Sequence, residues 1–192
     1  MKVYDTNIIK DQFPALQRKV WDKKLVYLDS AASMQKPKRV LDAISKSYSF
    51  NYSNVHRGLH KLSEEATANY EGSRIKVAKF INCSENEVIF TSGATAALNL
   101  IAYSWGMKNL SAGDEIIITI AEHHANIVPW QIIAEQKNVK IKAAHVDPNS
   151  EFNPDIIRDL ISDKTKIIAF PHVSNVLGLS LIHISEPTRQ IV

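Results

Sequence analysis

The chain has 192 residues, of which 45% are hydrophobic and 22% charged, and its formal net charge is +3. This near-balanced composition is typical of a globular protein and gives no support to a nucleic-acid-binding role. No run of about eighteen apolar residues predicts a membrane span, and the first residues lack the apolar core of a secretion signal. The single cysteine, Cys83, cannot form an internal disulfide, which fits a reducing cytoplasm.

The hydrophobic pattern predicts an α/β fold in which strands and helices alternate. In chain order we expect strands at 25–29, 87–91, 115–119, 139–146 and 166–172, and helices at 38–52, 63–82, 94–106, 126–138 and 154–162. The runs "EIIIT" and "KIIAF" within these strands are apolar throughout rather than alternating. Such runs are typical of a mostly parallel sheet with helices on both faces.

Ligands of such sheets bind outside the carboxyl ends of the strands. Three short sequences follow predicted strands there, namely "TSGATAALN" (91–99), "AEHHANI" (121–127) and "PHVSNVLG" (171–178). Their convergence at one edge predicts a ligand site.

The sequence "TSGATAALN" predicts a tight turn at Gly93 followed by a helix that begins with Ala94 and Thr95. The free amides of a helix amino terminus attract phosphate groups. The sequence is neither a P-loop nor GxGxxG. An ordinary helix start is the alternative.

The adjacent histidines of "AEHHANIVPW", His123 and His124, do not have the i, i+4 spacing of a zinc site. A ring at a strand's carboxyl end can lie flat over a bound heterocycle, or can simply be structural. In "PHVSNVLG", Asn175 is both a donor and an acceptor, which suits a phenolic or carbonyl oxygen of a ligand or an ordinary turn.

Two loops, "YLDSAAS" (27–33) and "NYSNVHRGLH" (51–60), combine small residues with histidines and Arg57. A histidine or arginine there would suit a substrate carboxylate, and a surface loop is the alternative.

Together these motifs, with "HKLSEEAT" and "AGDEIIIT", resemble the amino-terminal part of a SufS-type cysteine desulfurase from about Phe13 to Gly178. These are class V, fold-type I enzymes that use pyridoxal 5′-phosphate (PLP). The resemblance implies an amino-terminal arm at 1–24 and a truncated PLP-binding large domain at 25–178.

The resemblance assigns cofactor contacts to four residues. His123 matches the histidine that stacks on the pyridine ring and takes part in proton transfer. Thr95, with the Ala94 amide, matches the phosphate-binding turn, and Asn175 matches the residue bound to the phenolic oxygen. No metal is implied.

The resemblance also implies the substrate side and the reaction. Ala31 and Ala32 match a small-residue loop beside the substrate, and His56 and Arg57 match residues at the active-site entrance. The reaction would convert L-cysteine into L-alanine and pass persulfide sulfur to a SufE/SufU-like acceptor protein for iron–sulfur cluster assembly. The family implies a cytoplasmic homodimer.

The lysine that holds PLP, in a Ser-x-His-Lys segment, and the persulfide cysteine have no counterpart in this chain, and Cys83 does not match the latter. We therefore expect the 192-residue chain to be an inactive fragment. Alternatives are a selenocysteine lyase or other class V enzyme, or a non-catalytic truncated binding module.

The last stretch, 179–192, departs from the family pattern. Leu179–Arg189 corresponds to one translated frame of a transposase-type sequencing adapter. We expect these residues to be an artefact and exclude them from the fold.

Overall fold

The computed structural model describes residues 5–146 and 153–175. The chain divides into two compact units, Met1–Ile89 and Phe90–Val192, and each is described by itself. The expected adapter segment lies outside the described residues.

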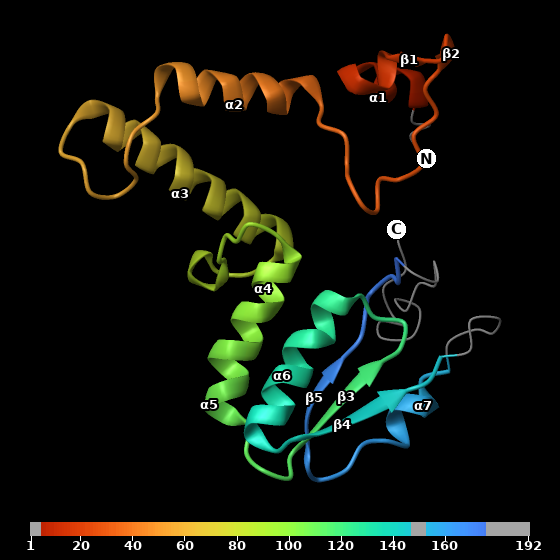
Figure 1. The fold of residues 1–192 in the computed structure, drawn as a ribbon. Helices are drawn as coiled ribbons and strands as arrows, with labels where there is room; N and C mark the ends of the chain where they lie inside the picture. The colour runs from red at the N-terminus through yellow and green to blue at the C-terminus, as the bar shows by residue number, and fades with distance from the viewer. Residues whose placement is uncertain (1–4, 147–152, 176–192) are drawn as a thin grey trace. The chain divides into compact units, whose positions relative to one another are not determined.

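The first unit consists mainly of helices (Figure 1). Its elements are α1 (Thr6–Asp11), η1 (Pro14–Gln17), β1 (Lys19–Val20), β2 (Lys23–Lys24), α2 (Lys38–Phe50), α3 (Lys61–Ile81) and η2 (Glu85–Glu87). The Asp5 carboxylate caps α1 by accepting from the Asn7 amide at 2.9 Å. α3 ends at Asn82, whose left-handed backbone is typical of a helix stop. The two long helices confirm the predictions at 38–52 and 63–82.

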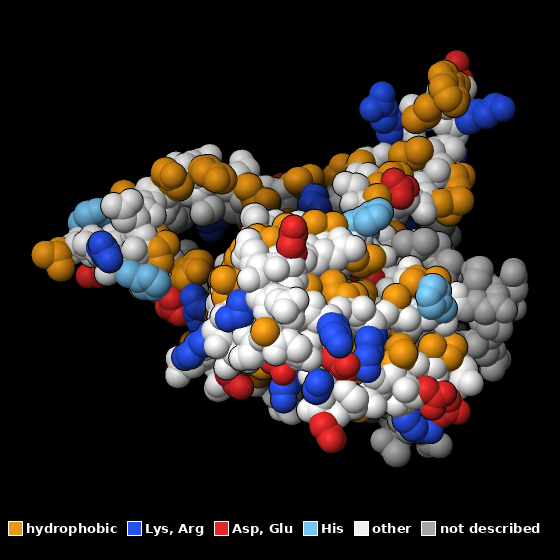
Figure 2. Space-filling view, turned by 60° about the horizontal axis from the view of Figure 1, so that its bottom comes forward, with side chains coloured by type: hydrophobic (Ala, Val, Ile, Leu, Met, Phe, Trp, Pro, Cys, Tyr) orange, Lys and Arg blue, Asp and Glu red, His pale blue; other side chains and the backbone are white. Residues whose placement is uncertain are grey.

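Few side chains of the first unit are buried. Among its described residues only Ser63, Ala78 and Val88 fall in that class. Hydrophobic side chains are spread over the visible surface in Figure 2, and Leu28 and Phe80 are about nine-tenths exposed. Contiguous exposed apolar area is typical of surfaces that bind other protein segments or ligands.

Two predicted strands are not formed. Residues 25–29 and 87–91 carry no strand assignment. A strand requires a hydrogen-bonded neighbour, and within the described residues neither segment pairs with another one. The apolar pattern of these two segments was therefore insufficient to predict a strand, because strand formation also requires a partner strand.

The second unit is a three-stranded parallel sheet with helices on both faces (Figure 1). Its elements are α4 (Ala94–Ile101), η3 (Ala102–Gly106, π-helical), α5 (Met107–Asn109), β3 (Glu115–Thr119), η4 (His124–Asn126), α6 (Val128–Lys137), β4 (Lys140–Ala144), α7 (Asp155–Arg158) and β5 (Thr165–Ala169). The strand order is β4-β3-β5. This arrangement confirms the predicted α/β class and its parallel sheet.

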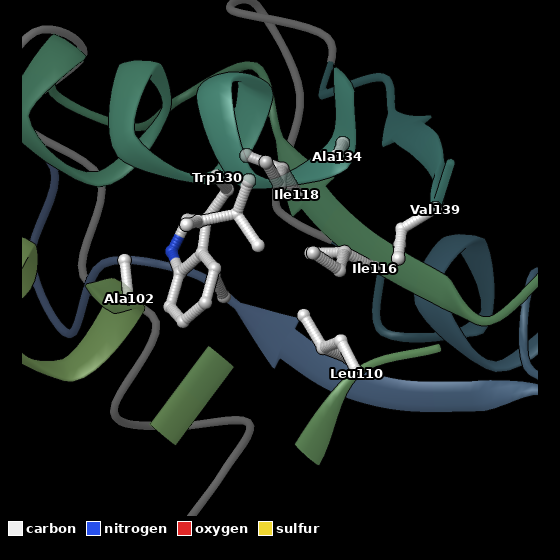
Figure 3. Packing of buried hydrophobic residues seen from close by; sticks show 9 residues of the cluster. Ala102, Leu110, Ile116, Ile118, Trp130, Ala134 and Val139 are labelled. Carbon is white, nitrogen blue, oxygen red and sulfur yellow. The ribbon is translucent and has the colours of Figure 1, made fainter. Parts of the chain in front are cut away.

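The core of this unit lies between β3 and α6 (Figure 3). Ile116 and Ile118 point to this face and pack in one cluster with Trp130 and Ile133 of α6. Gly106 permits its segment to approach Trp130 of α6 closely, because a Cβ atom on Gly106 would lie 3.2 Å from the Trp130 ring. Alternate residues of β3 thus anchor the helix that follows the strand.

The opposite face of β3 carries Ile117, which is fully buried. Lys142, its register partner on β4, donates to the Leu160 carbonyl at 2.9 Å. Because Leu160 follows α7 by two residues, the α7 segment covers this second face. Helices on both faces explain why β3 is buried along its whole length.

Candidate functional site

The carboxyl ends of β3 and β5 are joined by a hydrogen bond. The Ser174 hydroxyl, which is buried, donates to the Ala121 carbonyl at 2.8 Å. His123 follows Ala121 by two residues, and Asn175 follows Ser174 directly. Two of the three predicted motifs therefore meet at one edge of the sheet.

The third motif begins α4. Gly93 precedes the helix with extended backbone, and no described side chain caps it. Gly93, Ala94 and Thr95 are exposed, and a Cβ atom on Gly93 would meet nothing within 4 Å. The first-turn amides are thus accessible to an anion, and α4 packs against η4, which follows His123 directly.

The His123 side chain caps the short helix η4. Its Nδ1 atom accepts a hydrogen bond from the Ala125 amide at 3.1 Å. The ring of His124 meets that of His123 edge-on, with centroids 6.3 Å apart. The His123 ring is therefore held through Nδ1. Because both histidines are exposed, the rest of this ring is accessible to a ligand.

A series of hydrogen bonds between side chains supports the turn that carries His123. Glu122 is only 7% exposed, and its two carboxylate oxygens accept from the His123 amide at 3.0 Å and from Asn126 Nδ2 at 2.6 Å. Asn126 Oδ1 accepts from the Trp130 indole at 3.0 Å. In Figure 3 the indole nitrogen lies on the side of the ring away from the centre of the core.

The small-residue loop of the first unit is a turn. Ala31 and Ala32 are exposed within it, and the Ser33 amide donates to the Asp29 carbonyl at 3.0 Å. The Tyr27 hydroxyl lies within hydrogen-bonding distance of the carbonyls of both Asp29 and Ser33 and shares its single proton between them. This tyrosine therefore holds the predicted substrate-side turn in shape.

The loop with His56 and Arg57 is fastened to α3. The His56 amide donates to Thr67 Oγ1 at 2.8 Å, and the Gly58 amide donates to Ser63 Oγ at 3.0 Å. His56 has a φ of 73°, which is uncommon outside glycine. Between these two anchors Arg57 is exposed, and the described residues offer its guanidinium no hydrogen bond or ion pair.

A carboxylate binds the ring of His56. Glu71 Oε1 lies 2.7 Å from His56 Nε2, and Glu71 Oε2 accepts from Arg74 Nε at 2.9 Å. The hydrogen bonds from His56 and Arg74 hold the pKa of Glu71 below its ordinary value. Glu71 is therefore ionised at neutral pH.

The segments that carry the four residues assigned to the cofactor, namely Ala94, Thr95, His123 and Asn175, lie in the second unit, where α4 packs against η4 and Ser174 binds Ala121. The residues assigned to the substrate side belong to the first unit and are described there. Sequence reasoning missed the roles of Glu122, Asn126 and Trp130, although their regular four-residue spacing was visible in the sequence.

The described part of the chain contains no group of three or more His, Cys, Asp or Glu side chains that could hold a metal ion. Its helices are all too short or too polar to cross a membrane.

Similarity to known proteins shows the family of the chain. The sequence profile of the family "Aminotransferase class-V" matches residues 26–190. A "Probable cysteine desulfurase" from Vibrio cholerae is 51% identical over 171 residues, which are 88% of this chain and 42% of that protein. A "Probable cysteine desulfurase" from Synechocystis sp. is 47% identical over 171 residues, again 88% of this chain and 41% of that protein.

Solved structures share the fold. The apo cysteine desulfurase from Thermococcus onnurineus superposes with a TM-score of 0.82 at 32% identity, over 92% of this chain and 42% of that chain. The cysteine desulfurase CsdA from Escherichia coli superposes with a TM-score of 0.77 at 36% identity, over 92% of this chain and 43% of that chain. The chain thus spans about two fifths of the length of these relatives.

Proposed function

Because the chain belongs to the aminotransferase class-V family, we propose that it is the amino-terminal part of a PLP-dependent cysteine desulfurase. The whole enzyme would convert L-cysteine into L-alanine and transfer the sulfur to an acceptor protein for iron–sulfur cluster assembly. We propose that it works in the cytoplasm as a homodimer. The observation that carries the proposal is the meeting of three loops: α4 packs against η4, and Ser174 binds Ala121.

The residues of this edge fit PLP. The accessible amides at Ala94 and Thr95 suit its phosphate, since a helix amino terminus carries partial positive charge. The exposed ring of His123 suits a flat heterocycle, and the Asn175 amide suits a phenolic oxygen. When bound, PLP supplies an electron sink for the amino-acid α-carbon.

The chain's own residues would then bind and orient the cofactor and the substrate. Ala94 and Thr95 would hold the phosphate, and Asn175 would donate to the phenolic oxygen. His123 would cover one face of the ring and exclude water from it. In the first unit, Arg57 would attract an anionic substrate, because its guanidinium is exposed on a loop that Thr67 and Ser63 hold in place.

The test uses the longest reading frame that contains this chain, purified with PLP. Alanine formation from L-cysteine is measured for the native protein and for Thr95→Ala, His123→Gln and Asn175→Ala. We expect each variant to lose activity by roughly ten-fold or more, the effect of one misplaced cofactor contact. Asn109→Ala is the control, since its amide only binds the Trp105 carbonyl within its helix.

A native protein that binds PLP but leaves L-cysteine unchanged would contradict the proposed activity. The 192-residue chain is assayed beside it, and we expect no alanine from it. PLP-dependent alanine formation by that chain alone would contradict our proposal that the cofactor lysine and the persulfide cysteine lie outside it.

A further inference from the structure

The hydrogen bonds around His123 have only one consistent direction. An indole N–H can only donate, so the oxygen of the Asn126 amide faces Trp130 and its nitrogen faces Glu122. Amide N–H groups can only donate, so the two oxygens of Glu122 accept from the Asn126 amide and from the backbone amide of His123. The buried indole of Trp130 therefore determines that the amide nitrogen of Asn126 faces Glu122.

The same turn determines which nitrogen of His123 carries the proton. The backbone amide of Ala125 is a donor, and it points at His123 Nδ1 from 3.1 Å. Nδ1 must then present a lone pair, and in a neutral imidazole the proton lies on the other nitrogen. The contact is compatible only with the Nε2–H tautomer.

We propose that Glu122, Asn126 and Trp130 are positioning residues that hold His123 as its Nε2–H tautomer, so that His123 meets a bound ligand as a hydrogen-bond donor through Nε2. Nδ1 is engaged by Ala125, which leaves Nε2 as the nitrogen available at the exposed edge of the ring. The ligand group opposite His123 would then be an oxygen or nitrogen with a free lone pair. This last step rests on the proposed function, whereas the tautomer is a property of the chain itself.

The tautomer is directly measurable. The chain is labelled with ¹⁵N-histidine, and long-range ¹H–¹⁵N correlation spectra are recorded about two units above the ordinary histidine pKa of ~6.5. His123→Gln and His124→Gln assign the two neighbouring rings. We expect a single Nε2–H tautomer for His123 and the ordinary mixture for His124, whose ring nitrogens accept no hydrogen bond from the described chain.

Two variants test the supporting chain. Glu122→Gln keeps the size but offers one acceptor oxygen where two donors converge, and Trp130→Phe keeps a buried ring but removes the donor. In each variant, the ratio of the Nε2–H to the Nδ1–H tautomer of His123 should fall by roughly five-fold, the effect of one hydrogen bond. Trp105→Phe is the matched control, because this indole is 44% exposed and bonds to no described group.

A mixed or Nδ1–H ring in the native chain would overturn the proposal, and so would an unchanged ratio in Glu122→Gln with a native-like amide spectrum. If Glu122→Gln loses its native spectrum, Trp130→Phe decides, since it removes a single donor and no charge. Failure of the proposed function would be recognised separately: His123 would show the Nε2–H tautomer, but the protein would not convert L-cysteine.

Discussion

Nε2 of His56 lies 2.7 Å from Oε1 of Glu71, although 15 residues separate the two in the sequence. The bond ties the loop that carries Arg57 to the middle of α3, and Arg74 holds the other oxygen of the same carboxylate. His56 has a left-handed backbone, which costs of order 1–3 kcal/mol unless surrounding contacts enforce it. The side-chain and backbone bonds of His56 are these contacts.

Replacing Glu71 with alanine should therefore free this loop. We expect the backbone amides of His56 and Gly58 to exchange with deuterium several-fold faster, because their loop loses its side-chain anchor. Hydrogen–deuterium exchange followed by mass spectrometry measures this. Glu64→Ala is the control, since Glu64 lies on the same helix and only pairs with exposed Lys61 at 3.6 Å. Equal exchange in both variants would show that Glu71 does not restrain the loop.

Gly58 should tolerate no side chain. A Cβ atom there would overlap the side chain of Ser63, which is buried and accepts from the Gly58 amide. We expect Gly58→Ala to lower the free energy of unfolding by about 1–3 kcal/mol, the usual effect of overpacking. Urea unfolding followed by circular dichroism measures this change.

Gly72 offers a matched comparison within α3. A Cβ atom there would meet nothing within 4 Å, so alanine adds helix propensity without a clash. We expect Gly72→Ala to raise the free energy of unfolding by roughly 0.5–1 kcal/mol. Opposite signs for the two glycines are the expected result, and equal signs would contradict the close approach at Ser63.

The strands that sequence reasoning predicted correctly are those whose partner strands are in the described chain. Residues 115–119 form β3 with the predicted bounds, because β4 and β5 both follow within the chain and pair with it. The segments 25–29 and 87–91 have a similar apolar pattern and form no strand. Their pattern records a preference for burial, and a strand also requires a neighbour.

The site could be predicted as a set of strand ends, but its hydrogen bonds could not. Adjacent histidines do not reveal which ring nitrogen accepts from Ala125. The four-residue spacing of Glu122, Asn126 and Trp130 was visible, yet an acidic residue, an amide and an indole at this spacing have many possible partners. The left-handed backbone of His56 could not be predicted from the sequence, since histidine adopts this conformation more often than most residues but still only in a minority of cases.

The expected adapter origin of Leu179–Arg189 is tested on the source DNA. We expect amplification and resequencing across the codons for Gly178 and Leu179 to give a frame that continues into a longer gene. That gene should encode a Ser-x-His-Lys segment and a late cysteine. Finding the codons for 179–192 in the genome, followed by a stop codon, would establish a genuine truncated product and contradict the prediction.

The free energy of unfolding should depend on pH through Glu115, which is 7% exposed at the amino end of β3. Lys142 Nζ lies 2.6 Å from Glu115 Oε2, and the Ser162 hydroxyl donates to the same oxygen at 2.5 Å. The hydrogen bond from Lys142, followed by that from Ser162, lowers the pKa of this carboxyl.

A carboxyl whose pKa is lowered by folding stabilises the native state above its unfolded pKa of about 4.3, and this contribution disappears as pH falls through the lower folded pKa. The native chain should therefore exceed Glu115→Gln in stability at neutral pH, and the difference should shrink as the solution is acidified below about pH 4. Urea unfolding over a series of pH values measures both curves. Glu64→Gln is the control, because its pair with Lys61 is exposed and should contribute little at any pH. A difference between native and Glu115→Gln that stays constant down to the acid limit would show that the Lys142 pair does not stabilise the fold through its charge.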